Sequence, residues 1–390
     1  MLSVRAQALK PSLTLAIAAK AKQLQAAGKD ICSLSAGEPN FDTPAFIREA
    51  ATRALESGAT RYGPAAGEPQ LRAAIAAKLA RANGMVVTPE QVLVTNGGKQ
   101  ALYNLFQVLL NPGDEVLLPA PYWLSYPEMA QLAGASVRVV PSAAKDGFRL
   151  DLQALEALIT ERSRLLILNT PSNPTGLVLQ QHELEAVAEL LRRHPQLAVV
   201  CDEIYEFLLA PGQQHHSLAA LAPDLAERLF VVNGFAKGWA MTGWRLGYLA
   251  GPLPALKAAI ALQSQSTSNV CTFAQFGALA ALEASLDCVE EMAKSFSARR
   301  ALLTKGLQQL PGLVLVPPTG AFYAFPDVSD HGLNSLDFCN QLLDQEGLAL
   351  VPGAPFGDDR CVRLSCAVNS ATIEDGLNRL GRFLSNLNKS

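Results

Sequence analysis

The sequence has few residues of the kinds that staple a chain together or hold a metal. Its seven cysteines are scattered, odd in number and form no Cys-x-x-Cys pair, which argues against a disulfide framework and a zinc ribbon. Its five histidines show no His-Glu-x-x-His or related spacing, so we expect no metal site. We interpret the cysteines as reduced core residues in a chain long enough to bury a sizeable core without staples.

Excess positive charge and long apolar runs are also missing. Lys and Arg number 32 against 35 Asp and Glu, a formal net charge of −3, so nucleic acid is not an expected partner. The longest apolar runs, such as Leu102–Leu110, fall well short of the roughly 18 residues that span a bilayer. The first residues show no apolar signal segment. We therefore expect a cytoplasmic protein with small-molecule partners and no membrane association.

What is present is an alternation of apolar strand patterns with longer segments of helical period, typical of a parallel sheet covered on both faces. The sequence therefore predicts an α/β protein. The predicted strands are Val92–Thr95, Glu115–Pro119, Ser136–Val140, Arg164–Asn169, Leu197–Asp202, Leu229–Asn233 and Leu246–Ala250. Predicted helices include Ala45–Ser57, Lys99–Leu110, Tyr122–Ala133, Gln180–Arg193 and Ala371–Asn388.

The composition changes in the second half of the chain. After Gly251 the sequence becomes Ala-rich and helical in period up to about residue 310, and shorter strand and helix patterns follow. We place a domain boundary near residue 290, which gives a large ligand-binding domain over 43–290 and a small C-terminal domain over 291–390. The segment 1–42 carries a helix pattern with no strand partner nearby, so we expect it to pack with the small domain.

Four polar segments follow predicted strands, at the edge where ligands collect in open α/β sheets. They are Thr95–Gln100, Asn169–Gly176, Asp202–Tyr205 and Asn233–Lys237. In the first, a strand is followed by Gly97-Gly98 and then a helix, which points backbone N–H groups and a helix dipole at an anion. A phosphate would suit this segment, although a Gly-Gly pair also forms simple tight turns.

Two ionisable residues at these strand ends carry the chemistry. Asp202 follows the apolar run Leu197–Cys201, and a buried carboxylate there needs a cation, either an arginine in a structural ion pair or a ligand. Lys237 lies between apolar neighbours, so desolvation should lower the pKa of its amine and make it nucleophilic near neutral pH. Arg245 adds a planar cation that matches a phosphate.

The combination of Asn173-Pro174-Thr175-Gly176, Asp202-Glu203-Ile204-Tyr205, Lys237 and Trp244-Arg245 resembles the class I aminotransferases of fold type I, which use pyridoxal phosphate (PLP). Further motifs resemble the bacterial aspartate aminotransferase subgroup related to prephenate aminotransferases. The resemblance spans nearly the whole chain and implies a large domain with a mostly parallel seven-stranded sheet flanked by helices, plus a smaller α+β domain. The further motifs are Ser35–Pro39, Phe41–Pro44, Tyr62–Gly67, Gly97–Leu102, Pro121–Trp123 and Gly320–Tyr323.

The resemblance implies three catalytic residues. Lys237 would form the aldimine with PLP and then move the proton between the substrate Cα and the C4′ atom. Asp202 would pair with the pyridine nitrogen and keep it protonated, so that the ring accepts the electrons left by deprotonation. Tyr205, together with Asn173, would hydrogen-bond the 3′-oxygen of the ring.

The remaining cofactor contacts follow in the same way. Trp123 would stack on the face of the ring. The phosphate would be held by the backbone at Gly97 and Gly98, by Arg245, and by Tyr62 from a neighbouring subunit. A site shared between subunits implies a homodimer.

The resemblance also implies where a substrate would bind. Arg363 would hold the substrate α-carboxylate in a bidentate pair, assisted by the backbone of Gly37. Trp123 and Asn173 would line the same pocket.

The sequence departs from the family pattern at two places. Many relatives have a serine three residues before the lysine that binds PLP, where this chain has Gly234. The stretch 263–269 lacks the arginine that another subgroup uses for a distal carboxylate. Lys99 is the expected substitute, with Thr14 and Ser266 as weaker candidates, and the alternative for Lys99 is a second phosphate contact.

The expected function is PLP-dependent transamination between an amino acid, aspartate or glutamate first, and a 2-oxo acid such as 2-oxoglutarate, in a ping-pong sequence. An aromatic, prephenate or kynurenine-type aminotransferase and a C–S β-lyase are alternatives that only the side-chain pocket separates. A nucleotide-binding oxidoreductase is disfavoured because both common glycine fingerprints are absent. A non-catalytic regulator is disfavoured because the lysine is present. The sequence leaves open the preferred donor, the pathway and any assembly above a dimer.

Overall fold

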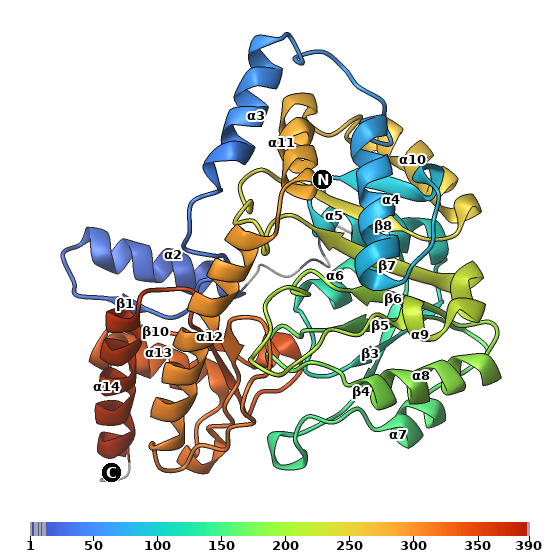
Figure 1. Ribbon diagram of the computed structural model, residues 1–390. Coiled ribbons are helices and arrows are strands. Elements are labelled where there is room, and N and C mark those ends of the chain that lie inside the picture. Colours follow the sequence, from blue (N-terminus) through green and yellow to red (C-terminus); the bar gives the residue numbers. More distant parts are fainter. Residues whose placement is uncertain (1, 4–6, 8, 10–12, 388–390) are drawn as a thin grey trace.

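The structure is a computed structural model that describes residues 2, 3, 7, 9 and 13–387 (Figure 1). Its largest element is a seven-stranded sheet with the strand order β2-β8-β7-β6-β5-β3-β4. Strand β8 runs antiparallel to both of its neighbours, and the other pairings in this sheet are parallel. The strands are β2 (Val92–Thr95), β3 (Glu115–Pro119), β4 (Ser136–Val140), β5 (Ser163–Asn169), β6 (Ala198–Asp202), β7 (Leu229–Gly234) and β8 (Gly247–Ala250).

This sheet confirms the predicted fold class, and each strand begins and ends within one residue of its predicted range. Successive side chains of a strand point to opposite faces, so a sheet covered on both sides needs apolar residues at nearly every position. In β6, Val199 and Cys201 join the core on one face, whereas Val200 joins the core on the other. Burial on both faces explains why the strands read as continuous apolar runs.

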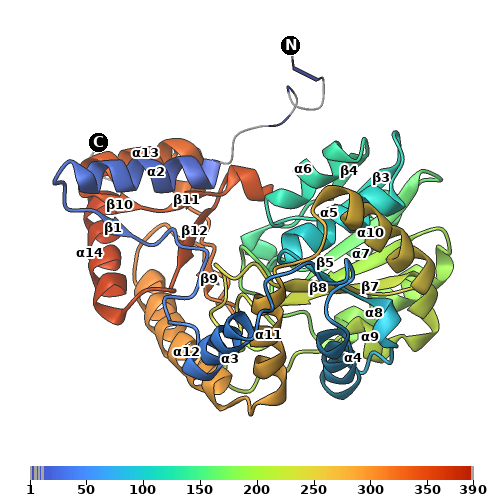
Figure 2. The ribbon, with the colours of Figure 1, turned by 90° about the horizontal axis from the view of Figure 1, so that it is seen from above.

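Helices cover the two faces of the sheet (Figure 2). Three helices pack on one face, and five cover the opposite core, to which Ile47 and Val289 from two further helices also contribute. A further helix, α3 (Ala45–Glu56), lies along α11. The first group is α5 (Gly98–Leu109), α6 (Ser125–Leu132) and α10 (Leu253–Ser266), and the second is α4 (Pro69–Asn83), α7 (Leu152–Ala157), α8 (Gln181–Arg193), α9 (Leu218–Leu221) and α11 (Thr272–Glu283).

Helix α6 is shorter than predicted. It begins at Ser125 rather than at Tyr122. The backbone N–H of Tyr122 donates to the carbonyl of Phe356, 2.9 Å away in the C-terminal part of the chain, so the segment before the helix is tied to a distant part of the chain that local sequence patterns do not reveal. The other predicted helices named above match within one residue at each described end, and Asn388 of the last one lies outside the described residues.

The second part of the molecule combines small sheets with four helices (Figures 1 and 2). Strand β1 (Cys32–Ser33) pairs in parallel with β10 (Leu348–Ala349), and β11 (Val351–Pro352), β12 (Val362–Ser365) and β9 (Tyr323–Ala324) form an antiparallel sheet. Phe296, Phe338 and Phe383 are buried in its core. The helices are α2 (Leu13–Ala26), α12 (Asp287–Gln308), α13 (Ser335–Glu346) and α14 (Ser370–Leu387).

Helix α2 packs against this second part, where Ile17 joins its core and Lys20 pairs with Asp344 at 3.0 Å. The expected boundary near residue 290 falls inside α12, which is continuous through that point. We keep the division into 1–42, 43–290 and 291–390 as a proposal. Over the residues that the structure describes, no helix has both the length and the apolar character needed to cross a bilayer.

Replacing Leu166 by alanine tests the contribution of the sheet core. Leu166 is fully buried in β5, so we expect the free energy of unfolding to fall by about 2–5 kcal/mol, from lost transfer energy and the cavity left behind. Val139→Ala, at a β4 position that is 38% exposed, should cost less than about 1 kcal/mol. Urea unfolding followed by circular dichroism measures both, and equal losses would contradict the burial pattern.

Candidate active site

The carboxyl edge of the sheet brings together the polar segments that follow the parallel strands. Asn169 and Asp202 are register partners at the ends of β5 and β6. The side-chain amide of Asn169 donates to the backbone carbonyl of Asp202 at 2.9 Å, and its side-chain oxygen accepts from the backbone N–H of Asn173 at 2.8 Å. One side chain therefore ties the loop after β5 to the end of β6.

Asp202 is a buried carboxylate without a direct cationic partner. It is 5% exposed, and its oxygens accept from the hydroxyl of Tyr126 at 2.7 Å and from the backbone N–H of Ile204 at 3.3 Å. Burial raises the pKa of Asp202 to about 6, against the effect of these hydrogen bonds. Among residues 13–387 no arginine pairs with it, so the structural ion pair considered above is absent there.

Lys237 is half-buried and its amine faces aromatic rings. Its Nζ lies 5.7 Å from the ring centroids of both Tyr205 and Phe322 and donates to the carbonyl of Gly37 at 2.5 Å. Desolvation lowers the pKa of the amine to about 8, and the cations of Arg363 and Arg245 act in the same direction. The predicted nucleophilic amine thus has the environment that its neighbours in the sequence indicated.

A second line of contacts runs from Tyr205 to the C-terminal part. The hydroxyls of Tyr205 and Tyr323 are 3.0 Å apart, and the guanidinium of Arg363 lies 4.5 Å from the Tyr323 ring centroid. Arg363 is 5% exposed and donates to the side-chain oxygen of Asn173 at 3.0 Å and to the carbonyl of Ser35 at 3.2 Å. Its Nε has no hydrogen-bond partner in the described part of the chain, which leaves a donor for a ligand.

The Gly97-Gly98 turn opens helix α5 next to Arg245. Gly97 has a φ of +80°, a left-handed conformation that side chains rarely adopt, and a Cβ at this position would also displace Nη2 of Arg245, 2.6 Å away. Arg245 is exposed and anchored by an Nη1 donation to the carbonyl of Thr242 at 2.9 Å. The helix N-terminus and this cation together form a cradle for an anion.

Lys99 lies next to Trp123, and Trp123 lies next to Tyr126, the residue that donates to Asp202. The Lys99 amine is 5.0 Å from the Trp123 ring centroid, and that ring meets Tyr126 edge-on at 5.3 Å. Desolvation and the charge of Arg245 lower the pKa of Lys99. Lys99 is therefore near enough to the anion cradle to feel its cation while its amine rests over the indole.

Gly234 replaces the serine of many relatives for a reason visible in the fold. A Cβ at this position would lie 2.8 Å from Cα of Gly247 and 2.8 Å from the carbonyl oxygen of Leu246. Both contacts are backbone atoms of the β7–β8 pairing, where Gly234 and Gly247 are register partners. A side chain at residue 234 would push β8 away from β7.

For two other predicted residues, Tyr62 and Ser266, no contact with this group is seen in the described part of the chain. Tyr62 projects from the loop between α3 and α4 with 92% of its surface exposed. Ser266 ends helix α10, where its hydroxyl donates to the carbonyl of Gln263 at 3.4 Å. The side chain of Thr14 lies outside the described residues.

The structure adds residues that sequence reasoning missed. Tyr126, whose hydroxyl donates to Asp202, comes from helix α6, which packs on one face of the sheet. It follows Trp123 by three residues, and this spacing is the only sequence signal for it. Phe322 and Tyr323 lie in a motif noted for the resemblance, but their contacts with Lys237 and Arg363 needed the structure.

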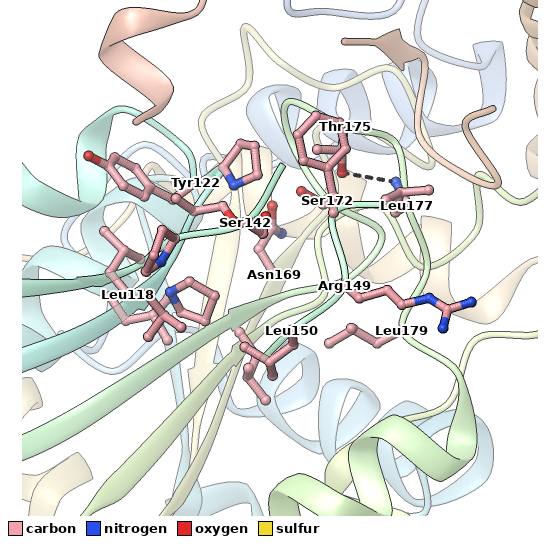
Figure 3. Close-up of a pocket in the computed structure, with 18 of the residues that line it drawn as sticks. Leu118, Tyr122, Ser142, Arg149, Leu150, Asn169, Ser172, Thr175, Leu177 and Leu179 are labelled. Atoms are coloured by element: carbon pink, nitrogen blue, oxygen red, sulfur yellow. Dashed lines mark hydrogen bonds between the residues drawn. The ribbon is translucent and has the colours of Figure 1, made fainter. Parts of the chain in front are cut away.

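A cavity of about 80 Å³ adjoins this site at the carboxyl ends of β3, β4 and β5 (Figure 3). Tyr126 and Asn169, which both contact Asp202, form part of its wall, and Thr175 accepts from the backbone N–H of Leu177 at its rim. Much of the remaining wall is apolar, including Leu118, Leu150 and Leu179. Lys237 and Arg363 do not line it, so this cavity is separate from the amine and guanidinium described above.

These features fit PLP. Asp202 is a buried carboxylate that lacks a cation, and a protonated ring nitrogen would supply one. The Gly97 cradle and Arg245 suit the phosphate, and the desolvated amine of Lys237 suits the aldehyde. Each part of the cofactor therefore has a complementary group at this sheet edge.

The family described as aminotransferase class I and II matches residues 29–380 of the sequence. The chain belongs to this family. It is thus a PLP-dependent, aspartate aminotransferase-like enzyme that transfers an amino group between an amino acid and a 2-oxo acid. The predicted family, cofactor and reaction type are confirmed.

Characterised relatives match over nearly the full chain. The aspartate/prephenate aminotransferase of Thermus thermophilus is 47% identical over 98% of both chains. A bifunctional aspartate and glutamate/aspartate-prephenate aminotransferase of Petunia hybrida is 46% identical, covering 98% of this chain and 82% of its own length. The solved aspartate aminotransferase of Thermus thermophilus with maleate superposes with a TM-score of 0.94 at 46% identity, over 98% of this aminotransferase and 99% of that chain.

Asp202→Asn should alter how the stability of the cofactor-free aminotransferase depends on pH. Because the folded pKa of about 6 exceeds the ordinary 3.8, the folded state binds more protons between these values, and the carboxyl becomes less favourable to folding as the pH rises through them. The variant should therefore gain stability over the parent chain more at about pH 7.5 than at about pH 4.5. Thermal unfolding of both apoproteins measures this, and an equal difference at both pH values would contradict a raised pKa.

Proposed function

We propose that this aminotransferase takes aspartate or glutamate as amino donor and a 2-oxo acid such as 2-oxoglutarate as acceptor, with Lys237, Asp202 and Tyr205 as its catalytic residues. The observation that carries the proposal is the environment of the Lys237 amine, which is desolvated against Tyr205 and Phe322 and faces the carbonyl of Gly37. Relatives named as aspartate aminotransferases, from Bacillus subtilis among others, support the choice of donor.

Lys237 is the base of the proposed reaction. When bound, PLP accepts the electron pair left behind as the Cα–H bond of the substrate breaks. The Nζ atom of Lys237 would take the proton from the substrate Cα and then donate it to the C4′ atom. A pKa lowered to about 8 keeps part of the amine neutral near neutral pH, which is the state that can accept a proton.

Asp202 holds the proton on the ring nitrogen in this proposal. The hydroxyl of Tyr126 and the N–H of Ile204 donate to its carboxylate and favour the ionised form against burial. Tyr205, whose hydroxyl lies 3.0 Å from that of Tyr323, would donate to the 3′-oxygen of the ring. Trp123, whose indole lies 5.0 Å from the Lys99 amine, would stack on the ring face.

Arg363 binds the substrate α-carboxylate. Its guanidinium is buried, held by Asn173 and Ser35, and retains a free Nε donor. A planar fork fixed in this way matches a carboxylate in two-point contact. Asn173 and the backbone of Gly37 complete this end of the pocket.

Lys99 binds the distal carboxylate of a dicarboxylic substrate. An ammonium on a flexible stem discriminates less sharply than a guanidinium fork, so we also propose prephenate-type keto acids as acceptors. The aspartate/prephenate aminotransferases among the relatives favour this second activity. If Lys99 instead contacts the phosphate, with Gly97, Gly98 and Arg245, its loss would weaken every substrate alike.

We further propose that the enzyme works in the cytoplasm as a homodimer. Tyr62 is an aromatic side chain in the loop between α3 and α4, and 92% of its surface is exposed. In a dimer with shared sites this hydroxyl would complete the phosphate cradle of the neighbouring subunit. Sedimentation velocity of the purified chain tests the dimer directly.

Lys237→Ala should abolish transamination, with a loss of at least about 10³-fold in kcat, because the proton carrier is removed. The variant should remain folded and dimeric. Lys294→Ala, an exposed lysine of α12, is the matched control and should keep normal activity. Steady-state rates with aspartate and 2-oxoglutarate measure both, and normal turnover by Lys237→Ala would refute the proposed function.

Lys99→Ala should lower kcat/KM for aspartate about a hundredfold while that for phenylalanine changes less than about threefold, because only the former carries a distal carboxylate. An S-substituted cysteine supplied without any 2-oxo acid serves as a separate control, since a C–S β-lyase would release a thiol, pyruvate and ammonia from it. Equal losses on both amino acids would assign Lys99 to the phosphate.

A further inference from the structure

A cluster of buried charges lies on the sheet face opposite to Tyr126. It comprises Lys78 of α4, Glu203 and Glu206 of the turn after β6, and His215 of the loop before α9, all with side chains at most 8% exposed. Asp202 and Glu203 are successive residues at the end of β6. Asp202 meets Tyr126 of α6, whereas Glu203 meets Asn83 of α4. The two carboxylates therefore point to opposite faces of the sheet.

Every carboxylate oxygen of the cluster has a donor. Glu203 accepts from Ser217 at 2.7 Å and from the side-chain amide of Asn83 at 2.7 Å. Glu206 accepts from the same Asn83 amide at 2.9 Å, from Asn233 at 2.8 Å and from Lys78. Lys78 also donates to the side-chain oxygen of Asn83 at 2.8 Å.

The cluster sets two basic groups beside two carboxylates. Lys78 pairs with Glu206, its charge also acts on Glu203, and His215 lies 3.4 Å from Glu203. Although burial opposes it, the carboxylate of Glu203 raises the pKa of His215 above its usual value, and Glu206 adds to this effect. A cation paired with a buried carboxylate offsets part of the cost of taking both charges out of water.

A metal ion is the other occupant to consider, because Glu203, Glu206 and His215 offer ligand atoms within 4.8 Å of one another. The hydrogen bonds above argue against a metal ion, because the ammonium of Lys78 already donates to Glu206 and every carboxylate oxygen of the cluster already has a donor. The two carboxylates are thus satisfied within the protein, whereas neither ring nitrogen of His215 has a hydrogen-bond partner in the described part of the chain.

The network joins the two segments that carry the proposed catalytic residues. Glu203 and Glu206 flank Tyr205 on the turn that begins at Asp202, and the backbone N–H of Glu206 closes that turn on the carbonyl of Glu203 at 2.9 Å. Asn233 donates to Glu206, and its side-chain oxygen accepts from the N–H of Gly234 at 2.7 Å. From there the chain reaches Lys237 three residues later.

We propose that Lys78, Glu203 and Glu206 are positioning residues for transamination: they fix the turn of Asp202 and Tyr205 relative to the segment that ends in Lys237. The inference rests on the proposed roles of those three residues. Misplacing a catalytic group by about 1 Å can cost up to about a hundredfold in rate. None of the positioning residues touches the reacting atoms.

The test replaces the buried pair by a neutral one, Lys78→Met with Glu206→Gln. The matched control is Glu115→Gln with Arg162→Met, which removes a buried carboxylate at the amino end of β3 and the exposed one of its two arginine partners, leaving Arg138. Three quantities are measured for each protein: the Kd of PLP for the apoprotein from tryptophan fluorescence, kcat and KM with aspartate, and the midpoint of thermal unfolding.

For the Lys78 and Glu206 variant we expect kcat to fall about tenfold, the Kd of PLP to rise about tenfold, and KM to change less than about threefold. The control should keep kcat and the Kd of PLP within about twofold of the unmodified chain, even if its unfolding midpoint falls as far as that of the Lys78 and Glu206 variant. Unchanged kcat and PLP affinity in the first variant, or equal losses in the control, would overturn the proposal.

If the double variant does not fold, Asn83→Ala removes the amide that bridges Glu203 and Glu206 while keeping all charges. It should lower kcat and PLP affinity about threefold in the same direction, and normal values would equally overturn the proposal. If the unmodified chain does not bind PLP at all, the proposed function itself is refuted. The variant outcomes above, measured on a chain that does bind PLP, test only the positioning role.

Discussion

The site depends on two ionisable groups held away from water at one edge of the sheet. Burial raises the pKa of Asp202 to about 6 and lowers that of Lys237 to about 8, so each is pushed toward its neutral form. In a chain without cofactor this burial lowers the stability of the fold, because neither Asp202 nor Lys237 is in direct contact with a group of opposite charge among the described residues. A protonated ring nitrogen beside Asp202, and an aldehyde within reach of Lys237, would relieve both, which is why the same burial that weakens the empty fold favours the loaded one.

The fold supplies this environment through close backbone packing. The reversed strand β8 lies so near β7 that residue 234 must be glycine, and the left-handed backbone at residue 97 favours glycine beside Arg245. The guanidinium of Arg363, which we propose binds the substrate, comes from β12 in the other part of the molecule and donates to Asn173 of the loop after β5. The site therefore forms only when both parts are in place. In the proposed mechanism the two faces of the sheet have different tasks, with Tyr126 tuning Asp202 on one side and the Lys78 network fixing its turn on the other.

Much of this was predictable from the sequence, because burial on both faces leaves long apolar runs and ligand residues follow them directly. The strands were predicted to within one residue, and Asp202, Lys237 and Arg245 stood out as charges at strand ends or in apolar surroundings. What local patterns could not reveal were contacts between distant segments. The hydrogen bond from Tyr126 to Asp202, the one that ties Tyr122 to the C-terminal part of the chain, and the pairing of Lys78 with Glu206 all depend on how elements far apart in the chain meet.

The central claim is that one desolvated amine, that of the half-buried Lys237, joins the cofactor. Reduction of the purified enzyme with borohydride in the presence of PLP, followed by proteolysis and mass spectrometry, would fix the cofactor on the lysine it occupies. The account predicts a pyridoxyl group on the peptide containing Lys237 in nearly every chain. Modification confined to another lysine, such as Lys99, or no modification at all, would contradict it.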